Sequence, residues 1–492
     1  MSDQLERSLE ILTSAELEPI VDMVFRALGP DSYEATSADG SSRFSRRVVG
    51  GAWEFTIDAV EGADPLANDA TDAFVGLEAE RAGLHPHRKD NAYPNGREQV
   101  AQLFDSADAP DLLVLHSAAH NWEDQGGHLG EHGSIDAIQA RAPFIIAGAG
   151  VRGDGRLPRH CRLIDVAPTV LSLLGATPGP GIGLTGEGRD DAFLARQDGE
   201  PLTDLLEGSR ADHVVGFLLD GCNPNVLYAM AEAGEAPNVA RLMSMGTTFD
   251  HGALSGLPTV TLANHTGTLT GCYPGHHGIL HNAWYDRAKG EQVITNSPAT
   301  WPWAMQRLRT DVETIHEAVQ RAFPGAFTAS FDEPADRGAS HSTFDAIRDG
   351  RFPDRFPTDQ LEHSTERFVR PSKDYRRMSS IDHLGAKDCV DLWAEVSPQF
   401  TWMNFALTDS AFHEGGPHSE MAAASVRDTD ARLGQVLAAV ERAGVFDRTA
   451  FVLVADHGME ETDPAVRGDW GPALRDAGIT FRDEAYGFLY FV

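Results

Sequence analysis

Short apolar runs alternate with amphipathic stretches along most of the chain. Two stretches have helical periodicity, residues 165–175, which begin at Asp165 and end at Gly175, and residues 430–444. Five runs rich in β-branched and aromatic residues are candidate strands: LLVLH at 112–116, PFIIAG at 143–148, VVGFLL at 214–219, WMNFAL at 402–407 and FVLVA at 451–455. This alternation predicts an α/β protein built on a mostly parallel sheet.

One passage interrupts these candidate elements. Residues 174–212 are rich in Gly, Pro and acidic side chains and show no clear periodicity, which predicts a linker or a long loop. The chain is therefore divided into residues 1–208 and 209–492. Residues 285–400 carry no readable motif, and a cap that sets substrate specificity could lie within them.

The composition is that of a large, acidic globular protein. The 492 residues are 41% hydrophobic, and 74 Asp and Glu against 40 Lys and Arg give a formal net charge of −34. Such a charge would repel long nucleic acids and anionic membranes, so we expect neither as a partner. A phosphate ester substrate would require a local concentration of cations, which points to metal ions.

Nothing in the sequence indicates export or membrane insertion. The first sixteen residues carry four acidic groups and lack an apolar signal core. No apolar run approaches the ~20 residues that span a bilayer. The four cysteines are widely scattered, which suits reduced thiols: Cys161, Cys222, Cys272 and Cys389. We expect a cytoplasmic protein.

Acidic residues stand at or just beyond the ends of three candidate strands. Asp220 follows VVGFLL, Asp409 follows WMNFALT and Asp456 follows FVLVA. Ligands of open α/β sheets bind beyond the carboxyl ends of the strands, so these carboxylates would converge and repel each other unless cations lay between them. Any one of them alone could be a loop cap or a turn former. Together they predict a metal site.

Two of these carboxylates are followed by a histidine. His457 comes directly after Asp456, and His413 comes four residues after Asp409. Carboxylate oxygen with imidazole nitrogen is typical of Zn²⁺ and acceptable to Mn²⁺ or Fe, whereas Mg²⁺ and Ca²⁺ prefer oxygen ligands. Asp409 and His413 alone could instead form an ion pair on a helix. Zinc is the first expectation for the metal.

A threonine stands at the start of another predicted helix. Thr261 precedes LANHTGTLTG, and the start of a helix directs backbone N–H groups and a positive dipole end at a bound phosphate. Coordination to a divalent metal can supply a threonine alkoxide without a histidine base. Thr259 or Thr261 could instead only cap the helix. Capping and nucleophilic attack are compatible roles.

These residues lie in motifs that resemble the nucleotide pyrophosphatase/phosphodiesterase branch of the alkaline phosphatase superfamily and its relative phosphonoacetate hydrolase. The motifs are Asp220-Gly221, Thr261 to His265, TGCYPGHHGILHN, Asp409 to Pro417 and Asp456 to Met459. The resemblance implies a three-layer α/β/α sandwich with two divalent metal ions. It implies Thr261 as the nucleophile, Asn282 beside the phosphoryl oxygens, one metal held by Asp220, Thr261, Asp456 and His457, and the other held by Asp409 and His413.

One ligand that the resemblance implies, a His in a G-x-HG motif near the end of the catalytic domain, is missing after Met459. The motif is found instead in the N-terminal part, as Gly130 to Gly133. We therefore expect a circular permutation, in which residues 1–208 resemble the C-terminal part of the family's domain and residues 209–492 its N-terminal part. His132 is the expected ligand, and His128 is its rival.

The resemblance implies a hydrolase of phosphate esters, first a phosphodiesterase or nucleotide pyrophosphatase that acts through a phosphothreonine. Its substrate would be a small phosphate ester or a nucleotide. Leu262-Ala263 replaces the Phe-Pro common in the pyrophosphatases, so hydrolysis of a phosphomonoester or of a phosphonate such as phosphonoacetate stays open. A metal-stabilised binding protein without turnover is the other alternative. A sulfatase is disfavoured, because the string from Cys272 to His276 lacks the arginine of the sulfatase motif.

Overall fold

The computed structural model describes residues 2–122, 127–208, 210–297, 299–350 and 373–491. Its centre is an eight-stranded sheet. In spatial order the strands are β19 (His341–Ser342), β18 (Thr328–Phe331), β20 (Phe400–Phe405), β13 (His213–Leu219), β21 (Thr449–Val454), β8 (Phe144–Gly148), β14 (Gly246–Phe249) and β9 (Gly155–Leu157). All neighbours pair in parallel except β8, which is antiparallel to β21 and β14. The predicted α/β fold with a mostly parallel sheet is confirmed.

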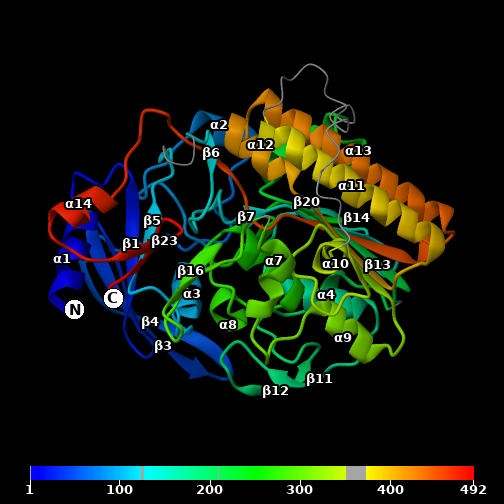
Figure 1. Ribbon diagram of the computed structural model, residues 1–492, viewed down its shortest axis with the longest axis horizontal. Coiled ribbons are helices and arrows are strands. Elements are labelled where there is room, and N and C mark those ends of the chain that lie inside the picture. The colour runs from blue at the N-terminus through cyan, green and yellow to red at the C-terminus, as the bar shows by residue number, and fades with distance from the viewer. Residues whose placement is uncertain (1, 123–126, 209, 298, 351–372, 492) are drawn as a thin grey trace.

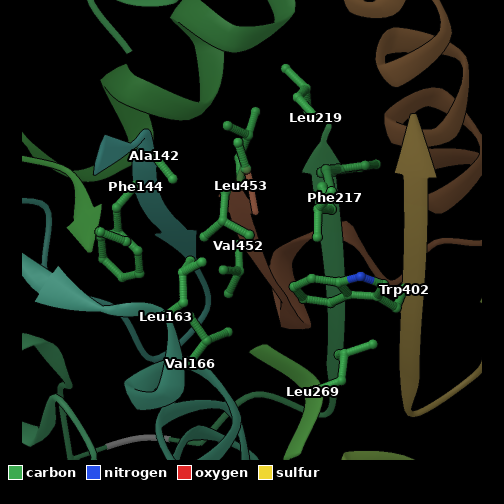
Figure 2. Packing of buried hydrophobic residues seen from close by; sticks show 14 of the residues in the cluster. Ala142, Phe144, Leu163, Val166, Phe217, Leu219, Leu269, Trp402, Val452 and Leu453 are labelled. Atoms are coloured by element: carbon green, nitrogen blue, oxygen red, sulfur yellow. The ribbon is translucent and has the colours of Figure 1, made fainter. Parts of the chain in front are cut away.

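The middle strands of this sheet are apolar on both faces. β13, β20 and β21 are buried along almost their whole length, as expected of parallel strands that helices cover on both sides. Gly216 of β13 pairs with Trp402 of β20, and a Cβ at Gly216 would come within 2.0 Å of the indole ring. The glycine therefore makes room for the buried tryptophan. Figure 2 shows this indole reaching from β20 across β13, below Phe217.

Helices lie on the two sides of the central sheet (Figure 1). On one side α11 (Lys373–Glu395), α12 (Leu407–Gly415) and α13 (Glu420–Arg442) pack together, and α6 (Pro237–Met245) packs on α13 and β8. On the other side α7 (Thr261–Thr270) contacts α4 (Val166–Leu173), which contacts α9 (Ile315–Ala322). This arrangement has the three layers expected from the sequence. The permuted order of the segments stays a prediction.

The two ends of the chain form a second sheet, which is antiparallel. The run LLVLH is a strand, as predicted, but it belongs to this sheet and not to the central one. A short buried apolar run specifies a strand without specifying its partners. In spatial order the strands are β23 (Arg482–Glu484), β24 (Phe488–Tyr490), β5 (Leu112–His116), β1 (Val21–Gly29), β2 (Ser32–Ser37), β3 (Gly40–Val49) and β4 (Ala52–Gly62).

Helices also pack on the second sheet. α1 (Ser2–Leu12) contacts both β1 and α14 (Gly471–Asp476), so the first and last helices of the chain lie side by side. Figure 1 shows both chain ends at this sheet. None of the described helices is both long and apolar enough to cross a membrane.

The passage predicted as a linker or long loop is more ordered than its composition indicates. It holds a hairpin of β11 (Gly179–Ile182) and β12 (Gly188–Ala192). The backbone N–H groups of Asp198 and Gly199 donate to the carbonyl of Gly271, at the end of α7. A short hairpin rich in Gly lacks the alternating side chains that reveal a strand, so no periodic signal is present there.

Residues 285–400, where a cap was considered, contribute to the main fold in their described part. β18, α9 and α11 belong to the central sheet and its layers. The region also holds the hairpin strand β17 (Glu291–Ile294), which pairs with β16 (Ala283–Asp286), and the short helix α10 (Thr343–Arg348). Residues 351–372, where part of that cap was considered, lie outside the described residues.

Candidate functional site

Three neighbouring strands bring the predicted carboxylates together. β20, β13 and β21 are adjacent and parallel, so their carboxyl ends meet at one edge. Asp220 directly follows β13, and Asp456 lies two residues after the end of β21. Asp409 lies in the first turn of α12, just after β20. Gly221 explains the local Asp-Gly sequence, because its φ is +63° and a Cβ there would lie 2.7 Å from an Asp409 oxygen. The predicted convergence of the three side chains is observed.

The first group of possible metal ligands lies beyond the carboxyl ends of β13 and β21. The Nε2 atom of His457 lies 3.0 Å from Oδ2 of Asp456 and 3.9 Å from Oδ1 of Asp220. The backbone N–H of Gly221 donates to the other Asp456 oxygen at 3.0 Å, which fixes the orientation of that carboxylate. These side chains are buried, so their charges are poorly screened by water.

The second group combines α12 with a segment almost three hundred residues earlier. The Nε2 atom of His132 lies 3.1 Å from Nε2 of His413 and 3.8 Å from Oδ1 of Asp409, and His413 Nε2 lies 3.3 Å from the same Asp409 atom. His128 instead contacts Glu131, with Nδ1 2.8 Å from Oε1. The geometry therefore favours His132 over His128 as the partner of Asp409 and His413.

The hydrogen bonds of the histidines fix which ring nitrogen can bind a cation. Nδ1 of His132 donates to the carbonyl of Thr259 at 2.7 Å, Nδ1 of His413 to that of Gly130 at 2.7 Å, and Nδ1 of His457 to that of Gly458 at 2.9 Å. A carbonyl only accepts, so each Nδ1 carries the proton and each Nε2 is left with its lone pair toward the carboxylates. Metal-binding histidines are held in this way by their other nitrogen.

The oxygen and nitrogen atoms at the centre of the site have no hydrogen-bond partner. They are Oδ1 of Asp220, Oδ1 of Asp409, Oδ2 of Asp456 and Nε2 of His457, all buried. A buried polar atom without a partner is costly. Cations bound at the two groups would satisfy all four atoms. The residues present therefore fit a pair of divalent metal ions, and nitrogen with oxygen ligands fits zinc.

The electrostatics of the protein alone show a shortage of positive charge at this edge. Burial, reinforced by Asp456 and Asp409, raises the pKa of Asp220 to about 8. Burial lowers the pKa of His457, but Asp456 and Asp220 together raise it to about 9. The pKa of His413 behaves in the same way, and Asp409 raises it to about 10. Protons thus balance the carboxylates, and divalent cations would displace them.

Thr261 is the first residue of α7, and no side-chain hydrogen bond caps this helix. Thr259 is engaged elsewhere, because its hydroxyl accepts from the backbone N–H of Gly133 and donates to the carbonyl of Ser134. Thr259 therefore anchors the segment that carries His132. The side chain of Asn282 accepts from the N–H of Leu262 at 3.2 Å, which places the amide beside the start of α7. Thr261 and Asn282 line the same pocket.

Two buried residues at the site received no role from the sequence. Nδ1 of His265 lies 2.8 Å from Oε2 of Glu333, and both side chains are fully buried. Nε2 of His265 lies 3.6 Å from Asp220 and 3.5 Å from Asp456. His265 stands in the same motif as Thr261, which was the available signal, whereas nothing local to Glu333 marks it.

Another possible ligand group lies far from this edge. Glu18, Asp39 and His87 form a further cluster of suitable atoms. Arg88 Nε lies 2.8 Å from one oxygen of Asp39 and Lys89 Nζ lies 2.8 Å from the other. These cations already neutralise the cluster, so we assign it no metal.

The candidate site opens into a pocket of about 410 Å³. One wall carries His132, Asp409, His413, Thr261 and Asn282. Other lining residues come from the second sheet and the segments beside it: Leu113, Val114, Leu115, Trp122, Tyr486 and Phe488. The two sheets therefore build the pocket together.

An α/β sandwich with two groups of Asp and His side chains beside a helix that starts at a threonine is what the resemblance to the alkaline phosphatase superfamily implied. Within it, the family model for type I phosphodiesterase / nucleotide pyrophosphatase matches residues 214–489. The chain belongs to this family of phosphoric ester hydrolases. The matched range holds every predicted site residue except His132.

Individual relatives are distant. Over 87 residues the chain is 32% identical to alkaline phosphatase PafA of Elizabethkingia meningoseptica, a match that covers 18% of this chain and 16% of that protein. Over 245 residues it is 23% identical to ectonucleotide pyrophosphatase/phosphodiesterase family member 1 of Mus musculus, covering 50% of this chain and 24% of the relative. The chain thus spans about a quarter or less of the length of these curated relatives.

Solved structures that resemble the chain include a murine ectonucleotide pyrophosphatase/phosphodiesterase 5 in complex with AMP, with 17% identity and a TM-score of 0.33. Phosphonoacetate hydrolase from Sinorhizobium meliloti 1021, in complex with phosphonoformate, has 23% identity and a TM-score of 0.35. Both matches cover 50% of this chain and 57% of the other.

Proposed function

We propose that the protein is a metal-dependent hydrolase of phosphate esters, of the phosphodiesterase and nucleotide pyrophosphatase type, with Thr261 as its nucleophile. The observation that carries the proposal is the convergence of three histidine Nε2 atoms and three carboxylates beside the start of α7. Family membership supports the same class of reaction.

The ligand sets follow from the two groups. Asp220, Asp456, His457 and Thr261 would hold one divalent metal ion, and Asp409, His413 and His132 the other. When bound, the two ions would lower the pKa of the Thr261 hydroxyl and neutralise charge on the phosphoryl oxygens. Zinc is the metal that this mixture of nitrogen and oxygen ligands favours, and Mn²⁺ or Fe would also be accepted.

The reaction would take place in two steps, each a displacement at phosphorus. The Oγ atom of Thr261 loses its proton and attacks phosphorus, one ester oxygen leaves with its electron pair and gains a proton, and a phosphothreonine that still carries the other ester group forms. Asn282 and the N–H groups at the start of α7 donate to the phosphoryl oxygens, as preorganised donors do in oxyanion holes. Water then attacks the same phosphorus and restores the threonine.

A substrate screen on protein of measured metal content tests this proposal. Wild-type protein should hydrolyse bis(p-nitrophenyl) phosphate faster than p-nitrophenyl phosphate or phosphonoacetate. Thr261→Ala should lose most turnover while it keeps the metal held by Asp409, His413 and His132. Thr270→Ala is the matched control, because its hydroxyl donates within the same helix, to the Thr266 carbonyl. Preference for the monoester or the phosphonate would select the alternative activities.

Stereochemistry separates the threonine mechanism from direct attack by water. Two successive in-line displacements retain configuration at phosphorus, whereas one inverts it. We expect retention with a chiral thiophosphate diester. Inversion, or wild-type turnover by Thr261→Ala, would remove threonine from the mechanism.

We also propose that the protein works in the cytoplasm. Its four cysteines are free and buried, which is typical of proteins kept under reducing conditions. Fractionation of the native cells tests this, and recovery of the protein outside the cytoplasm would contradict it.

A further inference from the structure

The second sheet ends in a strand whose outer edge is free. β4 is the last strand in the order of this sheet and pairs with β3 along one side, so among the described residues no strand pairs with its other side. All residues of β4 are exposed or half-buried. A free strand edge presents unpaired N–H and C=O groups, which are a template for pairing with another strand.

The hairpin of β3 and β4 also concentrates exposed apolar side chains. Val48, Val49, Ile57 and Val60 belong to it, and they are four of the ten large apolar side chains that are exposed in the described chain. Ile57 keeps 50% of its surface exposed. Single exposed apolar residues are ordinary, but this concentration on one hairpin indicates a contact surface.

The first half of β4 has an apolar row on one face. Ile57 pairs with the fully buried Phe44, Phe55 pairs with Arg46, and opposite residues of an antiparallel pair share a face. Trp53, Phe55 and Ile57 therefore lie on the face that Phe44 turns to the core. The Cζ atom of Arg46 lies 3.9 Å from the centre of the Trp53 ring, and the rings of Phe44 and Phe55 are 6.4 Å apart. This row extends the packed interior of the sheet to its free edge.

Residues 52–57, the edge segment, lack the features that usually protect a strand edge. The segment contains no Pro and one charged side chain, Glu54, which forms an ion pair with Arg47 of β3 at 2.8 Å. The bulge of β4 lies beyond the segment, at Asp58, which has no opposite residue in β3. The edge segment is therefore regular and open to pairing.

The hairpin is electrically neutral, although the chain is strongly acidic. Residues 40–62 hold three Arg and three Asp or Glu, whereas the formal net charge of the whole chain is −34. Two copies of the chain repel each other over most of their surfaces, so a neutral edge is where they can approach at low electrostatic cost.

We propose that β4 is the docking edge for a second copy of this chain, and that the edge segments of the two copies pair antiparallel about a twofold axis at Phe55. In that register Phe55 faces Phe55 of the copy, Trp53 faces Ile57, and Glu54 faces Thr56. Aromatic side chains meet aromatic or β-branched ones, which are favourable cross-strand pairs, and no two like charges are directly opposed. The strand is thus complementary to itself.

The docking edge lies away from the pocket. β5 and β24 contribute to the pocket lining, and β1, β2 and β3 separate them from β4 in the sheet. Pairing through β4 would therefore leave both pockets open, and the inference is independent of the proposed hydrolase function.

Light scattering on the purified full-length protein, over a dilution series, tests the docking edge. The wild type should approach twice the mass of one chain at high concentration, and added NaCl should favour the dimer by screening the repulsion between copies. Ile57→Glu should stay monomeric, because its carboxylate would be buried against Trp53 of the copy. Val75→Glu is the matched control, because Val75 is 43% exposed and lies outside the hairpin, and it should dimerise like the wild type.

Two further measurements guard against a variant that merely folds badly. The melting temperature of Ile57→Glu should change little at low protein concentration, because the position is exposed in one chain. Phe55→Cys tests the register, since the two new thiols would face each other and should form a disulfide between copies on oxidation. Val75→Cys should form none, and the four native cysteines are buried.

The proposal would be overturned by wild-type protein that is monomeric at every concentration and salt level. A dimer that persists in Ile57→Glu would place the contact elsewhere and would overturn it as well. A dimer that NaCl dissociates would be held by ionic contacts, contrary to the apolar edge. A dimer lost in Ile57→Glu, kept in Val75→Glu and linked through Phe55→Cys is the result that we expect.

Discussion

His132 Nε2 lies 3.1 Å from His413 Nε2, although 281 residues separate the two histidines in the chain. His132 donates to the carbonyl of Thr259, and His413 lies in α12. Their contact therefore brings the N-terminal and C-terminal segments of the chain together at the candidate site. A cation bound by Asp409 would be within reach of both Nε2 atoms.

Loss of His132 should remove one metal. We expect His132→Ala to bind one ion per chain in place of two, because Asp220, Asp456 and His457 are untouched. Activity should fall by about a hundredfold or more, since a few kcal/mol of transition-state stabilisation would be lost. Elemental analysis measures the number of bound ions, and kinetics measures the activity. His128→Ala is the matched control and should keep two ions, and a loss of metal in that variant instead would make His128 the ligand.

Chelation should lower stability as well as activity. An ion that binds only the folded state stabilises it by about 2.7 kcal/mol at a free concentration one hundred times its Kd. The melting temperature should therefore fall on chelation and recover with Zn²⁺. Asp409→Asn should show a smaller metal-dependent shift. Asp39→Asn should show the wild-type shift, because Arg88 and Lys89 already neutralise that residue's cluster. Full activity in metal-free protein would contradict the metal mechanism.

Asn282 should act in the transition state. We expect Asn282→Ala to lower kcat by about 10²–10³-fold with little change in metal content, the cost of losing one preorganised donor. Asn282→Asp should be no better, because it can still accept from the Leu262 N–H but replaces the donor with a negative charge. Asn296→Ala provides the comparison, since the side chain of this pocket asparagine accepts from Trp301 Nε1 and not from the N–H of Leu262. Equal losses in the two alanine variants would argue against a specific role.

The protein should still fold when residues 209–492 precede residues 1–208 in the chain. The chain ends lie together, and Arg7 of α1 donates to the carbonyl of Ala477 just after α14. A variant that joins the two ends by a short Gly-Ser linker and begins after Gly208 should fold and bind two metals. Opening the chain within β13 should prevent folding, because that strand is central to the sheet. Circular dichroism and metal content report the result, and failure of the first variant would weaken the permutation prediction.

The stability of the junction between the sheets should depend on pH. His276 bridges Asp198 and Asp105 at 2.6 and 2.9 Å, with Arg46 and Arg196 beside the two carboxylates. Burial lowers the pKa of His276, but these carboxylates raise it above its ordinary value of 6.5. Its contribution is therefore fully present below about pH 6.5 and is lost as pH rises through the folded-state pKa.

The melting-temperature difference between wild type and His276→Gln, both metal-loaded, measures this contribution. It should be largest near pH 6 and shrink as the pH rises above 6.5. A difference that is constant, or that grows with pH, would show that the histidine does not titrate between the two states.

The sequence by itself determined the local elements and most of the candidate ligands. Strand formation depends on short apolar runs, so β13, β21 and β8 were predicted closely. The strand predicted at 402–407 was placed two residues too late, because the apolar pattern of β20 (Phe400–Phe405) continues into α12. Asp220, Asp456 and His457 stand next to such runs, so their place at the strand ends could be read from the chain. Thr261 at the start of α7 was readable for the same reason.

Only the tertiary structure decided which of these elements meet. The order β20-β13-β21 places the three carboxylates at one edge, and no local pattern fixes strand order. LLVLH became a strand of the antiparallel sheet, and Glu333 reached His265 across 68 residues. The rings of Trp122 and Tyr486 also meet, although the two residues are far apart in the sequence. Propensity acts over a few residues, whereas these pairings arise from burial of a shared core, so the sequence could supply the ligands but not their neighbours.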